Sequence, residues 1–207
     1  MKETYPLALA LFDFVPVIFF LTGAIYLVRI ATRMCGTRCR RLAIIGSLLI
    51  FLGGFLKALW KLLVATGVGD FQLMSEAQFA LVAPGFALLL IVVIGMARSE
   101  GNLAKGEDTL IPAIAVWKIP LLIVMTLASM GVMGILTYIS FRHFAKIAAA
   151  GFIVAFLCLV GMGSMASGEQ TLTRQWIEQS VNALGQLGFM IGTIFLFLNI
   201  ENAYNRK

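Results

Sequence analysis

The chain consists almost entirely of six long apolar segments, each long enough to cross a lipid bilayer. A helix needs about 20 mostly apolar residues to cross a hydrocarbon core roughly 30 Å thick. Backbone polar groups find no water to bond inside lipid, so such segments must be helical. The sequence therefore predicts an all-α polytopic membrane protein with six transmembrane helices. They span approximately Tyr5–Ala31, Leu42–Thr66, Glu76–Ala97, Ile111–Phe141, Phe144–Ser167 and Thr173–Ile200.

Composition favours the same class, since 60% of the residues are hydrophobic and only 13% are charged. An ordinary soluble domain has about one quarter charged residues. The fourth segment is longer than a bilayer requires and contains Pro112 and Pro120. Its first residues are expected to lie along the membrane interface, although two shorter spans remain an alternative.

Two short patterns recur in the second half of the chain. In the first pattern, three residues recur 104 positions later in the chain. In the second, ALVAPGF (80–86) matches ALGQLGF (183–189), 103 positions later. These matches predict two three-helix halves, residues 1–103 and 104–207. Because three crossings are an odd number, the second half is expected to be inverted, an architecture common in transporters. A duplicated bundle without a transport role is the alternative. The residues matched in the first pattern are Pro16, Thr22 and Ala24 with Pro120, Thr126 and Ala128.

The loop between the first two segments is basic and contains no acidic residue. Short basic loops stay cytoplasmic, so this loop is predicted inside and both termini outside. That topology places Arg142, His143 and Lys146 outside, which is contrary to the rule that basic loops stay inside. Compact loops suit a bacterial cytoplasmic membrane. The arginine cluster is short and has no aromatic platform, so the expected partners are anionic membrane lipids and not nucleic acid. The loop arginines are Arg29, Arg33, Arg38, Arg40 and Arg41.

The cysteine and histidine content argues against a metal or cofactor site. Cys35 and Cys39 fall in the predicted cytoplasmic loop, where a disulfide is not expected to persist. A structural zinc site needs four ligands, and the only histidine, His143, is predicted on the other side of the membrane.

Charged residues inside the predicted spans are the candidate site. Such residues are costly in lipid and are usually paired or functional. Asp13 and Lys57 are predicted at the same depth, roughly 12–14 Å below the outer boundary, and are expected to pair. Lys61 lies one turn above Lys57. With Trp60 and Glu76 they would outline an outer pocket; a buried ion pair that only fixes helix packing is the alternative.

A second polar group is predicted on the inner side. Glu178, Asn182 and Gln186 recur every four residues on one face of the sixth helix, and Lys118 lies in the fourth. This face is expected to line a wet vestibule or to form interhelical hydrogen bonds.

These features favour a transporter or channel-like protein for a polar or anionic solute or a lipid headgroup. No pair of carboxylates is placed for one substrate atom, so a non-enzymatic role is preferred. A membrane-embedded lipid-modifying enzyme and an accessory subunit are the alternatives, and the protein is expected to form a homo-oligomer or to pack against another membrane subunit.

Overall fold

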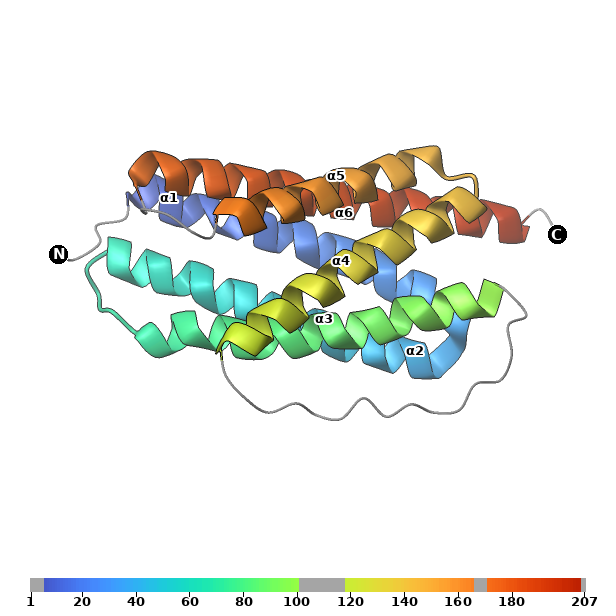
Figure 1. Ribbon diagram of the computed structural model, residues 1–207, viewed down its shortest axis with the longest axis horizontal. Coiled ribbons are helices and arrows are strands. Elements are labelled where there is room, and N and C mark those ends of the chain that lie inside the picture. Colours follow the sequence, from blue (N-terminus) through green and yellow to red (C-terminus); the bar gives the residue numbers. More distant parts are fainter. Residues whose placement is uncertain (1–5, 101–117, 166–170, 206–207) are drawn as a thin grey trace.

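The computed structural model describes residues 6–100, 118–165 and 171–205, and every regular element in these ranges is a helix. Figure 1 shows the helices packed side by side along the long axis of the molecule. The all-α class is therefore confirmed for the described residues. In chain order the helices are α1 (Leu7–Phe12), α2 (Phe14–Ala65), α3 (Gln72–Glu100), α4 (Lys118–Arg142), α5 (Lys146–Met165) and α6 (Leu172–Asn205).

Five helical stretches in the described part of the chain are long and apolar enough to cross a membrane, which indicates a membrane location. The first covers 59 residues. At a rise of 1.5 Å per residue it would extend about 88 Å if straight, nearly three times the hydrocarbon thickness. The stretches are Leu7–Ala65, Gln72–Ser99, Ile123–Arg142, Lys146–Gly163 and Leu172–Asn205.

The first stretch is not straight, because α2 turns back on itself at Gly36. This residue has φ 79° and ψ −162°, a conformation that glycine adopts without a side-chain clash. It divides α2 into a first arm (residues 14–35) and a second arm (residues 37–65). The arms are antiparallel, since Lys61 near the end of the second arm contacts Asp13, which immediately precedes the first arm.

The direction of the remaining helices follows from their contacts. The rings of Phe12 and Trp176 lie 5.8 Å apart at one end of the bundle, and those of Tyr26 and Phe197 lie 5.7 Å apart farther along. The first arm and α6 therefore run in the same direction. Figure 1 shows that α3 and α4 share this direction, while the second arm and α5 run the opposite way.

The predicted inverted relation between the halves is not confirmed for the described helices, because α1 and α4 run in the same direction. The prediction assumed that the chain enters α4 at the end of the bundle where α3 finishes. Instead, α3 finishes and α4 begins at opposite ends (Figure 1). The connecting residues 101–117, which include the start of the predicted fourth span, lie outside the described residues.

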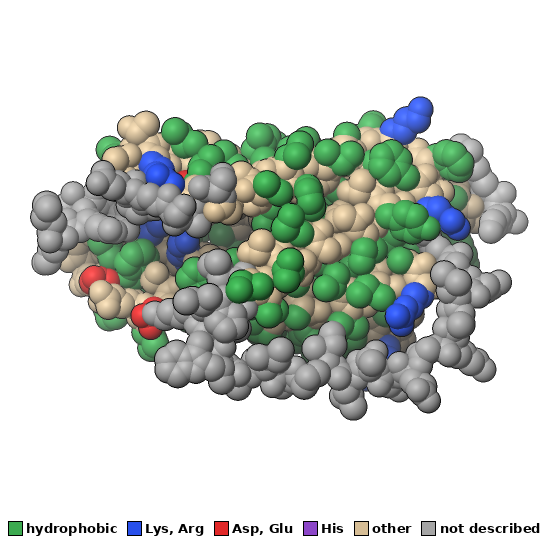
Figure 2. All heavy atoms as spheres, in the orientation of Figure 1, with side chains coloured by type: hydrophobic (Ala, Val, Ile, Leu, Met, Phe, Trp, Pro, Cys, Tyr) green, Lys and Arg blue, Asp and Glu red, His purple; other side chains and the backbone are tan. Residues whose placement is uncertain are grey.

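The first and last described residues lie at opposite ends of the bundle (Figure 1), so the prediction that both termini share one side is not confirmed. The α4–α5 turn, with Arg142, lies at the end that carries the hairpin at Gly36. We call this the arginine end, and Figure 2 shows basic side chains gathered there, with a mainly hydrophobic surface toward the middle of the molecule. Its arginines are Arg29, Arg33, Arg38, Arg40, Arg41, Arg98 and Arg142.

The expectation of reduced cysteines beside the hairpin is also corrected, because Cys35 and Cys39 form a disulfide. Gly95 of α3 leaves room for it, since a β-carbon there would lie 3.1 Å from the Cys35 sulfur and 3.3 Å from the Cys39 sulfur. Nearby, the Ser99 hydroxyl donates to the Met34 carbonyl at 2.7 Å. These contacts fix the end of α3 against the corner of the hairpin.

Glycines set the closest helix crossings. A β-carbon at Gly46 of the second arm would lie 2.9 Å from the carbonyl oxygen of Gly85 in α3. A β-carbon at Gly151 of α5 would lie 2.6 Å from the carbonyl oxygen of Gly188 in α6. Both crossings bring backbone against backbone, as small residues permit in membrane bundles.

Candidate functional site

A cavity of about 610 Å³ lies between both arms of α2 and helices α3 to α6, in the half of the bundle away from the arginine end. Its size falls within the range of small-molecule sites. Residues predicted for two separate sites line this one cavity. They are Asp13, Lys57, Trp60, Lys61, Glu178, Asn182 and Gln186.

The predicted division into an outer and an inner site is therefore wrong. It followed from the inverted arrangement, which sent the beginning of α6 to the inner side. Because α6 runs parallel to the first arm, Glu178 lies at the same end as Asp13, and its carboxylate is one of the charges that act on Lys57.

Asp13 occupies a break in the first helix. Pro16 has no backbone N–H to donate to the Phe12 carbonyl, and its ring crowds that carbonyl. α1 accordingly ends at Phe12, and α2 begins at Phe14. By contrast, Pro84 lies within α3 without interrupting it.

The Asp13 carboxylate pairs with Lys61 and not with the predicted partner Lys57. Its Oδ2 atom lies 2.6 Å from Lys61 Nζ, and the two side chains are 4% and 8% exposed. The predicted depth was in error by one helical turn, because it was measured from approximate segment ends. The second oxygen, Oδ1, is buried and has no hydrogen-bond partner. Asp13 therefore keeps a free acceptor while bound to Lys61.

Lys57 is the cation without a direct partner. It lines the cavity, and within the described part of the chain its ammonium forms neither a salt bridge nor a hydrogen bond. The charges of Lys61, Asp13 and Glu178 act on it through space. An ammonium held away from bulk water favours an anion as its partner.

Glu178 is already neutralised by a neighbour on its own helix. Arg174 Nε lies 3.2 Å from Glu178 Oε1, at the i,i+4 spacing that brings side chains together on a helix. The opposite charges thus cancel within each of two ion pairs, Asp13 with Lys61 and Glu178 with Arg174. Lys57 remains as the positive charge in excess.

Amide side chains extend the polar wall around these charges. They come from α6 and from α3, and each carries both donors and acceptors. The predicted polar face of α6 thus lines a cavity and does not face lipid. The amide residues in the wall are Gln78, Gln175, Gln179, Asn182 and Gln186.

The deeper part of the cavity is apolar. Along the second arm, Phe51 lies ten residues below Lys61, a distance of about 15 Å. Gly54 lies between them and leaves room beside the backbone. The cavity is therefore amphipathic, with charges at one end and an apolar floor at the other. The floor includes Phe20, Phe51, Phe86, Met125 and Met133.

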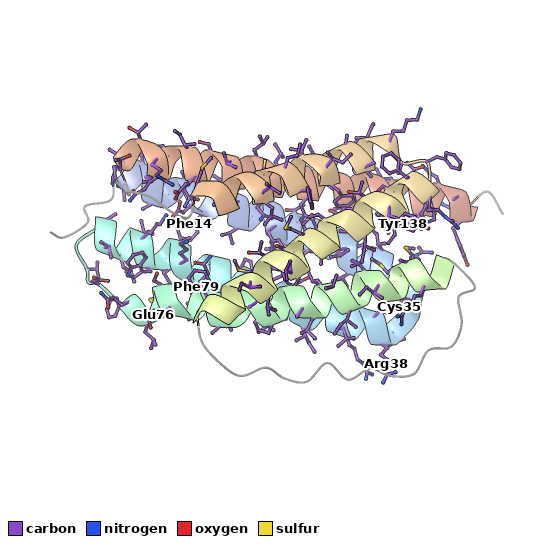
Figure 3. All side chains as sticks on the ribbon, in the orientation of Figure 1. Phe14, Cys35, Arg38, Glu76, Phe79 and Tyr138 are labelled. Atoms are coloured by element: carbon purple, nitrogen blue, oxygen red, sulfur yellow. A yellow bond between two sulfur atoms is a disulfide. The ribbon has the colours of Figure 1, made fainter. Side chains whose placement is uncertain are left out.

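Three predicted residues take other places. Trp60 lines the cavity but donates from Nε1 to Asp70 Oδ1 at 2.9 Å, which anchors it to the following turn. Glu76 is exposed and does not line the cavity, whereas Phe79 on the same helix does (Figure 3). Lys118 begins α4, and its side chain lies outside the described part of the structure.

The sequence prediction omitted Gln78 and Arg174. Gln78 lies near the start of the third apolar segment, two residues after Glu76. Its backbone carbonyl oxygen lies 3.1 Å from a β-carbon placed on Gly53, so α3 crosses the second arm at this point. Arg174 was recognisable from its i,i+4 spacing to Glu178.

The arrangement suits non-covalent recognition of an anion. No group of three or more potential metal ligands occurs within the described ranges. No protein-family model, curated protein or solved structure matches this chain in the comparisons with known proteins. The function is therefore inferred from the cavity alone.

Proposed function

We propose that the chain is an integral membrane protein with six membrane-embedded helical segments. Each arm of α2 is long enough for one crossing, and α3, α4, α5 and α6 supply the other four. The arginine end would face the cytoplasm, because short basic segments are retained there, although this places the Cys35–Cys39 disulfide in a compartment where disulfides are rare. The α4–α5 turn lies at that same end, so its Arg142 follows the rule as well. The cavity would then lie in the outer half of the membrane.

The two halves would be related as a parallel repeat, with both entering the membrane from the same side. Gly46 against Gly85 in the first half corresponds to Gly151 against Gly188 in the second. Each crossing joins the second and third helices of its half. Parallel repeats occur in known transporter folds, as do inverted ones.

The function best supported by this cavity is capture and transport of an anionic molecule that also has an apolar part. The observation that carries the proposal is Lys57, a cation without a direct partner in a cavity whose other charges are paired. The unpartnered Asp13 Oδ1 would accept a hydrogen bond from a hydroxyl or amide on the same ligand. The apolar floor below would hold a hydrocarbon portion.

The enzyme alternative has weaker support. Asp13 and Glu178 both line the cavity, but each carboxylate is paired with a cation, and Asp13 keeps only Oδ1 as a free acceptor. A general acid or base needs hydrogen-bond access to the reacting atom. The accessory-subunit alternative keeps some support, because α6 covers α5 at Gly151 but a β-carbon at Gly163 of α5 would meet nothing within 4 Å.

The proposal can be tested with simple amphiphiles of matched length. The protein in lipid nanodiscs would be titrated with hexyl phosphate, hexanol and hexyltrimethylammonium, with binding followed by calorimetry. Hexyl phosphate is expected to bind most tightly. Lys57→Gln should weaken it about 10- to 100-fold, the effect of losing one charged hydrogen bond.

Lys146→Gln is the matched control, because Lys146 is exposed at the arginine end. The anion-binding proposal fails if hexanol binds as well as hexyl phosphate, or if Lys57→Gln binds hexyl phosphate like the parent protein. Uptake of labelled hexyl phosphate into proteoliposomes then tests transport. Tight binding without uptake would leave a binding role and overturn the transport step.

A further inference from the structure

A second hollow lies on the outside of the bundle at the arginine end. It is a groove of about 660 Å³ between the two arms of α2 and α6. Apolar residues with substantial exposure form its sides, including Ile25 at 49%, Ile44 at 36% and Leu48 at 51%. An apolar groove on a membrane helix pair faces lipid chains, so a hydrocarbon occupant is available along its length.

Three arginines line this groove, and they differ in whether a carboxylate pairs with them. Arg33 pairs with Glu201 at 3.4 Å. Arg29 lies over aromatic rings, 5.5 Å from the centroid of Tyr26, and has no carboxylate partner within the described ranges. Arg40 has neither an ion pair nor a hydrogen bond to any described residue. Two guanidinium groups on opposite arms are thus left for an anion.

A buried hydroxyl lies below the arginines. Ser47 is 7% exposed, lines the groove, and its Oγ atom has no hydrogen-bond partner. A serine hydroxyl in a helix commonly donates to the carbonyl four residues earlier, and here it does not. Ser47 lies seven residues beyond Arg40 on the second arm, about 10 Å deeper. The groove therefore has a charged mouth, an apolar wall and one unused buried donor.

We propose that this groove binds an anionic glycerophospholipid of the adjoining leaflet. The phosphate would bind between Arg29 and Arg40, since guanidinium groups form strong charged hydrogen bonds to phosphate oxygens. One acyl chain would follow Ile25, Ile44 and Leu48. The Ser47 hydroxyl would donate to an ester carbonyl. Basic pockets between transmembrane helices on the cytoplasmic side bind acidic lipid headgroups in this way.

The lipid site requires the chain to lie in a membrane but does not depend on the ligand of the cavity. Phe51 lines both hollows, so the test must separate them. Lys57→Gln provides that separation, because Lys57 lines only the cavity. It should abolish the preference for hexyl phosphate and leave lipid binding unchanged.

The test is lipid binding by native mass spectrometry of the detergent-solubilised protein, with phosphatidylglycerol and phosphatidylcholine of the same acyl chains. Phosphatidylglycerol is expected to be retained preferentially. Arg29→Gln and Arg40→Gln should each weaken it about fivefold. Arg41→Gln is the control, because Arg41 is exposed next to Arg40 but does not line the groove.

A second pair of variants tests the apolar wall. Ile44→Trp should fill the groove and displace the lipid, while Ile45→Trp, exposed at 49% outside it, should not. Inorganic phosphate at millimolar concentration should compete poorly, because it lacks the acyl chain. Equal retention of the two lipids, equal loss in Arg41→Gln, or full competition by inorganic phosphate would each overturn the proposal.

Discussion

Removing the Asp13 carboxylate is expected to destabilise the folded protein more than removing its partner Lys61. Asp13→Asn leaves the ammonium groups of Lys57 and Lys61 together without the carboxylate between them. Lys61→Met leaves Asp13 with Lys57, whose charge already acts on it. The two ends of one ion pair should therefore give unequal losses of stability.

The magnitudes follow from the geometry of the pair. At 2.6 Å and an effective dielectric constant near 20, the Coulomb attraction is about 6 kcal/mol. Desolvation costs several kcal/mol for each ion, so the intact pair contributes little net stability. Breaking a buried pair from one side typically costs about 3–5 kcal/mol, and we expect this for Asp13→Asn. Lys61→Met should cost about 1–3 kcal/mol, the penalty of an imperfectly satisfied buried group.

The assay is reversible unfolding in mixed micelles of the parent, both single variants and the double variant. A coupling energy of about 0.5–3 kcal/mol is expected between contacting residues. The pair of Arg33 and Glu201, 46% and 36% exposed, is the control and should show a coupling below about 1 kcal/mol. Additive losses at Asp13 and Lys61, or a larger loss for Lys61→Met, would refute the reasoning.

Two further predictions concern packing and the disulfide. Gly188→Ala should cost about 1–3 kcal/mol of unfolding free energy, because its β-carbon would lie 2.7 Å from the Gly151 carbonyl oxygen; Gly134→Ala, which meets nothing within 4 Å, is the control, and equal losses would contradict the close crossing. Maleimide labelling of the denatured, unreduced protein should modify Cys158 alone, and all three cysteines after reduction; labelling of all three before reduction would show that the disulfide is not formed.

The sequence was sufficient to predict the all-helical class and the charged part of the cavity wall. Unbroken apolar runs restrict the chain to membrane helices, and charged residues within such runs must find partners or a ligand. Asp13, Lys57, Lys61 and Glu178 were identified on that ground alone, and they line one cavity.

The direction of the second half was not predictable from the same patterns. Hydrophobic periodicity reports that a segment is a helix, and it carries no information about which end of the bundle the helix enters first. The positive-inside rule did indicate a different topology. Arg142 violated the predicted topology, and the parallel arrangement removes that violation by placing it at the arginine end.

The wrong choice of Lys57 as the partner of Asp13 has a similar origin. One helical turn separates Lys57 from Lys61, a rise of about 6 Å, which is smaller than the uncertainty of a segment end read from hydropathy. The choice of Lys61 as the partner of Asp13 depends on the break before Pro16 and on the register of the hairpin at Gly36. Both are set by backbone geometry that hydropathy does not specify.

A parallel repeat would also explain why the cavity is charged on one side and apolar on the other. If Gly46 corresponds to Gly151, the same offset makes Lys57 of the second arm equivalent to Met162 of α5. Both residues line the cavity, as equivalent positions around an axis along the bundle should. The first half would then supply the cation at this level and the second half an apolar side chain. An anion that is polar on all sides would leave the apolar wall without a matching group, whereas an anion with a hydrocarbon portion matches both walls.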